Sequence, residues 1–171
     1  MSFVCRERSM KKAKTVYRTE VRREDREAVC RLVAETGFFS AEEIAIATEL
    51  VEERLKQGEE SGYFFLFAEA EQRLVGYACF GPIPGTLHSF DLYWIAVKPS
   101  GQGRGAGRAI LMAAELAMAD KGAKRIYVDT SSRPQYEPTR LFYKACGYAE
   151  AAFLEDFYAP RDGKIIFVKS L

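Results

Sequence analysis

Residues 101–108 read Gly101-Gln102-Gly103-Arg104-Gly105-Ala106-Gly107-Arg108, with glycine at every second position of the first seven. The apolar run Phe90–Val97 before this segment is typical of a buried strand, and Arg108–Lys121 after it has apolar residues at helical spacing. A glycine-rich turn between a strand and a helix lets a ligand approach the backbone and meet the unpaired N–H groups of the helix N-terminus. The segment therefore predicts an anion site suited to a phosphate or pyrophosphate, flanked by the charges of Arg104 and Arg108.

The chain on either side of this turn alternates between helical and strand patterns. Ser40 and Glu43 form a capping box that begins a helix. Helices are expected over Glu24–Glu35, Ser40–Gln57, Arg108–Lys121 and Glu137–Cys146, and strands over Thr15–Arg22, Tyr63–Ala68, Leu74–Phe80, Phe90–Val97, Ile126–Asp129, Ala149–Tyr158 and Lys164–Lys169. This order predicts a single α/β (α+β) domain, with a mixed, mostly antiparallel sheet of about six to seven strands flanked by about four helices.

The composition is that of one globular domain: the chain has 171 residues, 48% of them hydrophobic and 29% charged. We expect residues 1–14 to be a basic flexible tail and 15–171 to form the domain. The net charge of +1 gives no general field for nucleic acid. No apolar run approaches the ~20 residues that span a bilayer, and the N-terminus lacks the apolar segment of a signal peptide.

Cysteine and histidine usage argues against a metal site. The chain contains no CxxC pair, and His88 is its only histidine. A structural zinc site needs four ligands at tight spacing, so no metal is expected. The cysteines are scattered, which suits a reducing cytoplasm, and they occupy positions Cys5, Cys30, Cys79 and Cys146.

Two nucleotide-binding classes compete for the glycine-rich segment. A Walker A loop needs Gly-Lys followed by Ser or Thr, which is absent. A dinucleotide fingerprint matches in letters from Gly101 to Ala106, with Asp129 placed as a ribose-binding acid. That fingerprint usually opens its domain, however, and only 42 residues follow Asp129, ending in two consecutive strands. A nucleotide-dependent oxidoreductase is therefore the weaker alternative.

A third class fits better. Gln102–Gly107 satisfies the pattern Q/R-x-x-G-x-G/A, Leu92–Pro99 precedes it as a strand ending in V-x-P, and Leu141–Tyr148 is similar to an FYxxxGF segment. In these three motifs and their order, the sequence resembles the GNAT superfamily of acetyl-CoA-dependent N-acetyltransferases, over about residues 15–171. The sequence departs from the family pattern at Tyr136 and Thr139, where asparagine and alanine are frequent.

The resemblance implies acetyl-CoA as co-substrate and assigns roles to particular residues. Cofactor contacts would come from Ile95, Ala96, Val97, Gln102, Gly103, Arg104, Gly105, Ala106, Gly107 and Arg108. In the family, a splayed break in the central strand frees backbone groups for the pantetheine arm. The N–H of Ile95 or Val97 is then the candidate oxyanion donor. Tyr143 corresponds to the general acid beside the CoA sulfur.

The general base is left open between three candidates. Asp91 resembles the position of the catalytic glutamate in histone acetyltransferases and would accept the amine proton directly or through water. His88 titrates near neutral pH and is a second candidate, and water is the third.

The acceptor is not specified by the motifs. The resemblance implies direct attack by a primary amine of a small molecule or amino acid, with a protein lysine or N-terminal amine as the alternative and a non-catalytic CoA-binding module as a further one. Acceptor-lining segments are expected at Thr36–Ser40, Pro82–Ser89 and Phe157–Lys164. We expect a cytoplasmic monomer or homodimer without nucleic-acid or membrane partners.

Overall fold

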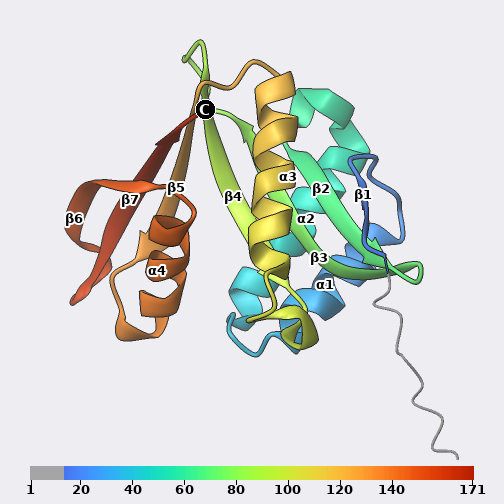
Figure 1. Cartoon of the computed structure of the whole chain (residues 1–171), viewed down its shortest axis with the longest axis horizontal. Helices are drawn as coiled ribbons and strands as arrows, with labels where there is room; N and C mark the ends of the chain where they lie inside the picture. Colours follow the sequence, from blue (N-terminus) through green and yellow to red (C-terminus); the bar gives the residue numbers. More distant parts are fainter. Residues whose placement is uncertain (1–13) are drawn as a thin grey trace, which may run out of the picture.

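A computed structural model describes residues 14–171, so the predicted tail lies almost wholly outside the described part of the chain. Figure 1 shows a seven-stranded sheet in the order β1-β2-β3-β4-β5-β7-β6. The strands are β1 Val16–Arg18, β2 Phe64–Ala70, β3 Arg73–Pro82, β4 Ser89–Val97, β5 Arg125–Ser131, β6 Ala149–Ala159 and β7 Asp162–Ser170. The helices are α1 Asp25–Glu35, α2 Ala41–Gln57, α3 Ala106–Asp120 and α4 Glu137–Ala145, with single 3₁₀ turns η1 Gly58–Ser61, η2 Pro99–Gly101 and η3 Pro134–Tyr136.

The sheet is mixed and mostly antiparallel, which confirms the predicted fold class. Only the β4–β5 pair of the described strands is parallel. After β5 the chain adds β7 and β6 by antiparallel pairing instead of repeating βα units. The dinucleotide-binding interpretation of Gly101–Ala106 is therefore wrong, because its fold needs successive parallel strands.

The first strand is shorter than the predicted Thr15–Arg22. It ends at Arg18, whose guanidinium bonds Asp25 (Nη1 to Oδ2, 2.8 Å) and Glu69 (Nε to Oε1, 2.8 Å). The Arg22 N–H donates to Asp25 (2.7 Å), which turns the chain into α1. Asp25 is buried, and its pairing with Arg18 satisfies a charge that would otherwise be costly to bury.

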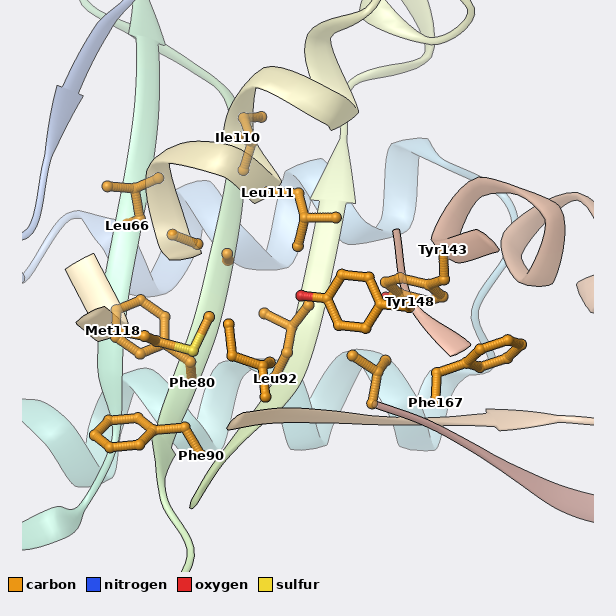
Figure 2. Packing of buried hydrophobic residues seen from close by; sticks show 14 of the residues in the cluster. Leu66, Phe80, Phe90, Leu92, Ile110, Leu111, Met118, Tyr143, Tyr148 and Phe167 are labelled. Carbon is orange, nitrogen blue, oxygen red and sulfur yellow. The ribbon is translucent and has the colours of Figure 1, made fainter. Parts of the chain in front are cut away.

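Two hydrophobic layers enclose the sheet. α1 and α2 cover one face of β2–β4, where Val29, Val51, Phe65, Phe67 and Tyr77 are each at most 1% exposed. α3 and α4 lie on the opposite face (Figure 1). Figure 2 shows the core beneath α3 and α4, including Leu92, Leu111, Tyr143, Tyr148 and Phe167.

A β-bulge at Tyr93 exchanges the two faces along β4. Leu92 pairs with Phe80 and faces α3, whereas Trp94 pairs with Cys79 and faces α1 and α2. Beyond this point β4 also separates from β5, because their pairing stops at Asp91 opposite Tyr127. The backbone of the second half of β4 thus has β3 on one side and no paired strand on the other.

We expect Leu111→Ala to lower the free energy of unfolding by about 2–5 kcal/mol, because a fully buried side chain would leave a cavity between α3 and the sheet. The neighbouring Met112 is 55% exposed, so Met112→Ala should change stability by less than about 0.5 kcal/mol. Urea unfolding of both variants measures the difference. Equal losses would contradict the assigned orientation of α3.

Candidate active site

The glycine-rich segment forms an open, uncapped start to α3. Gly103 and Gly105 have φ of 68° and 83°, and Gly105 is the N-cap residue without a side-chain cap bond. A Cβ built at either glycine meets no atom within 4 Å. No side chain caps the first-turn N–H groups of α3, and no side chain projects from Gly103 or Gly105 in front of them, which leaves room for an anion. Arg104 and Arg108 are exposed beside it, as predicted.

The predicted cofactor residues do not all have the same function. The Gln102 side chain donates from Nε2 to the Val97 carbonyl (3.0 Å), so it fastens the loop to the end of β4. The Lys98 N–H donates to the Val75 carbonyl (2.8 Å), which fixes the same junction to β3. Ile95, Ala96 and Val97 lie on the half of β4 that has separated from β5. The structure thus brings the predicted backbone groups of β4 beside the loop that begins α3.

Tyr143 lies in the core between α4 and the sheet (Figure 2) and is 4% exposed. Its ring centroid is 5.3 Å from that of Phe142 and 5.5 Å from that of Tyr148. Burial raises the pKa of the Tyr143 hydroxyl above its ordinary value. The phenol therefore stays protonated at neutral pH, as a proton donor must.

A buried charged group near Tyr143 was missed from sequence. Glu115 of α3 accepts from the Tyr148 hydroxyl (3.0 Å) and from Lys169 Nζ (2.7 Å), at the edge of a cavity of about 150 Å³ between α3, α4 and β7. Glu115 lies on the apolar face of α3, and the sequence could have indicated this. A glutamate on such a face needs a hydrogen-bonding or charged partner.

Asp91 occupies the point where β4 and β5 separate. It points away from Leu92, so it shares the α1–α2 face of the sheet with Asp129 and Lys164. Lys164 forms an ion pair with Asp129. Burial, and then the charge of Asp129, raise the pKa of the half-buried Asp91. A carboxylate with a raised pKa beside a strand opening suits proton transfer.

His88 lies at the opposite end of the sheet. It precedes β4, and its Nδ1 is 3.1 Å from the Gly122 carbonyl, beyond the C-terminus of α3. Eight residues of extended chain, about 26 Å, separate it from Ala96. The hypothesis of His88 as base is therefore wrong for this site. The predicted acceptor segment Pro82–Ser89 is misplaced for the same reason.

The other predicted acceptor segments do border the α1–α2 face. Phe38, between α1 and α2, makes an edge-to-face contact with Tyr136 (4.9 Å), and Phe39 packs against Trp94 (4.8 Å). The Tyr136 hydroxyl donates to Glu43 Oε1 (3.4 Å). From the β6–β7 side, Lys164 lies 4.8 Å over the Phe157 ring. Tyr136 thus contacts the segment between α1 and α2. The sequence showed only that tyrosine replaces the asparagine frequent in the family at this position, and it did not predict these contacts.

Within residues 14–171, no group of three or more His, Cys, Asp or Glu side chains is arranged to hold a metal ion. The helices of this described range are all too short or too polar to cross a bilayer.

Comparisons with known proteins agree with this geometry. The model of the Acetyltransferase (GNAT) family matches residues 18–148. A search of curated proteins found no match. Among solved structures, a protein from Desulfovibrio desulfuricans assigned to the GNAT family is 41% identical, with a TM-score of 0.90 over 92% of this chain and 99% of that one.

Two more distant structures share the fold. An aminoglycoside 6′-N-acetyltransferase complexed with coenzyme A is 18% identical, with a TM-score of 0.71 over 91% of this chain and 96% of that one. The ribosomal-protein-S18-alanine N-acetyltransferase from Escherichia coli is 18% identical, with a TM-score of 0.72 over 92% and 94% of the two chains.

In Gly105→Val, the new side chain would occupy the space of the pyrophosphate in front of the first turn of α3. CoA binding should weaken at least about tenfold, because each N–H bond to a charged oxygen that is lost is worth roughly 1.5–3 kcal/mol. Gly122, at the other end of α3, also has positive φ and open space around its Cβ position. Gly122→Val is therefore the matched control: it carries the same backbone strain and should keep wild-type affinity. Calorimetry measures both variants. Equal affinities would mean that the loop is only a turn.

Proposed function

Because the chain belongs to the GNAT family of acetyltransferases, we propose that it moves the acetyl group of acetyl-CoA to the primary amine of a small molecule or amino acid. The observation that carries the proposal is the separation of β4 from β5 beside the uncapped N-terminus of α3. The strand separation supplies free backbone groups for an extended pantetheine arm, and the helix N-terminus supplies N–H donors for phosphates.

The cysteines bear on localisation. Free thiols at Cys30, Cys79 and Cys146 support a cytoplasmic setting.

The residues fit the cofactor in two parts. The first turn of α3, with Gly103, Gly105 and Arg108, would hold the pyrophosphate. The backbone of Ile95–Val97 would hold the pantetheine arm. When bound, acetyl-CoA supplies the thioester carbonyl that the amine attacks. An N–H of this β4 segment would then stabilise the oxyanion.

Two side chains on opposite faces of the sheet would complete the proton transfers. Asp91, on the α1–α2 face, accepts the amine proton directly or through water. Tyr143, on the α3–α4 face, donates to the departing thiolate. The separated strands lie between them, so base and acid would act from the two sides of one opening.

A protein amine is the second candidate acceptor. Large apolar side chains are exposed along β6 beside the Asp129–Lys164 pair, and a bound polypeptide could cover them: Leu154 is 42%, Phe157 53% and Tyr158 50% exposed. The E. coli relative acts on a ribosomal protein. A panel of small amines and lysine peptides, with CoA thiol release as readout, separates the two acceptor classes.

The same panel tests the reaction itself. Binding of acetyl-CoA without thiol release from any amine would indicate a CoA-binding module, whereas binding of NADH and not of CoA would overturn the proposed cofactor.

Tyr143→Phe should lower kcat by ~10²–10⁴, the usual contribution of a positioned general acid. CoA affinity should stay unchanged, because the variant loses one hydroxyl and little packing. Tyr77→Phe is the control, since Tyr77 is equally buried but lies on the α1–α2 face with an unpartnered hydroxyl. Steady-state kinetics with calorimetry measures both, and a normal rate in Tyr143→Phe would remove the acid role.

Asp91→Asn should lower kcat/KM most between the pKa of Asp91 and that of the amine, where the carboxylate is ionised and the amine is still protonated, and least near the amine pKa. Asp129→Asn tests the same carboxylate without removing it. Because this variant lacks the negative charge that helps to raise the pKa of Asp91, that pKa falls and the acid limb of the profile moves to lower pH. Profiles of kcat/KM against pH measure both. A loss in Asp91→Asn that is independent of pH would indicate a positioning role.

A further inference from the structure

Four aromatic side chains form a continuous row across the α1–α2 face. Trp94 of β4 packs on Phe39 (4.8 Å), Phe39 on Phe38 (5.1 Å), and Phe38 on Tyr136 of η3 (4.9 Å). The row starts at the separated half of β4, where the transfer is proposed, and ends at Tyr136. All four residues are partly exposed, so the row retains surface that a ligand can cover.

Glu43 stands at the far end of this row. Its Oε2 accepts from the Ser40 N–H (2.7 Å) and completes the capping box of α2. Its Oε1 accepts a hydrogen bond from the Tyr136 hydroxyl, and the oxygen–oxygen distance of 3.4 Å is long for a bond to a carboxylate. The cap needs an acceptor but no charge, because glutamine serves equally well at this position. The charge of Glu43 adds the modest stabilisation that a carboxylate gives to a helix N-terminus, and this leaves the carboxylate available to a cationic ligand.

The other carboxylates near this face divide into paired and unpaired ones. Asp129 pairs with Lys164, and Asp162 pairs with Arg133 (3.1 Å). Within residues 14–171, neither Glu43 nor Asp91 has a cationic side chain within 4.0 Å. Arg133 also lies 5.5 Å over the Tyr136 ring, but its guanidinium is paired with Asp162. Neither the Glu43 nor the Asp91 carboxylate is thus closed off from a ligand by an ion pair with a cationic side chain of the described residues.

Building on the proposed acetyl transfer, we propose that the acceptor carries a second cationic group, which binds Glu43 and the rings of Phe38 and Tyr136. The reacting amine lies beside β4 and Asp91, while the second ammonium or guanidinium group completes the pairing of Glu43. Aromatic ring faces attract cations, and an adjacent carboxylate strengthens that attraction. Because three ring-to-ring steps of about 5 Å separate Trp94 from Tyr136, the two nitrogens are several bonds apart. Glu43, Phe38 and Tyr136 are thus specificity-determining residues.

The test compares linear diamines, from 1,3-diaminopropane to 1,8-diaminooctane, with n-alkylamines of the same carbon number. Calorimetry on the CoA-saturated protein measures binding, and thiol release measures kcat/KM. The best diamine should bind at least about tenfold more tightly than its monoamine, the worth of one charge-assisted hydrogen bond.

Glu43→Gln keeps the capping box but removes the charge, so it should abolish the preference for diamines by lowering their affinity to that of the monoamines, and it should lose no more stability than the loss of another first-turn carboxylate causes. Glu42→Gln is the matched control: Glu42 is exposed in the same first turn of α2, and this variant should keep the preference.

Equal binding of diamines and monoamines by the wild type, or an undiminished preference in Glu43→Gln, would overturn the assignment. A preference for diamines in binding without acetyl transfer would support the site while refuting the proposed reaction, so the two claims fail separately.

Discussion

The separation of β4 from β5 is the constraint on which the rest of the site depends. These strands form the one parallel pair among the described strands, and they share only Ser89–Asp91 against Arg125–Tyr127. A longer ladder would consume the backbone groups of Ile95–Val97 and close the sheet. β3 holds β4 on its other edge as far as Val97, and Gln102 fastens the following loop to it. The opening is therefore rigid on one side and unpaired on the other.

The bulge at Tyr93 gives this opening two chemically different sides. Leu92 joins the core under α3, whereas Trp94, two residues later, joins the aromatic row on the α1–α2 face. Without the extra residue, strict alternation would direct Leu92 and Trp94 to the same face. The proposed cofactor loop lies beside α3, and the carboxylates Asp91 and Glu43 lie on the α1–α2 side. The one inserted residue therefore lets Leu92 pack under α3 and Trp94 pack on the α1–α2 face.

Local sequence patterns predicted most of the fold and the loop, because capping boxes, glycines and apolar periodicity act over a few residues. The order of elements was predictable for that reason, whereas the cofactor role of the Ile95–Val97 backbone came from the family resemblance and stays a prediction. The positions of His88 and Pro82–Ser89 relative to the site were not predictable, since they depend on which end of β4 separates from β5. The contacts of Tyr136 with Phe38 and Glu43 join positions that are 98 and 93 residues apart in the chain, and no local rule links such positions.

The two helices that border the opening begin in opposite ways, and the difference bears on function. α2 starts with a complete capping box at Ser40 and Glu43, whereas α3 starts at Gly105 with positive φ and no side-chain cap. A glycine N-cap gives up about a few tenths of a kcal/mol that serine or aspartate would supply. A ligand anion can restore that stabilisation only if no side chain already occupies the first-turn N–H groups. The N–H groups at the start of α3 thus have no side-chain partner, whereas the cap of α2 fixes the carboxylate of Glu43 against the Ser40 N–H.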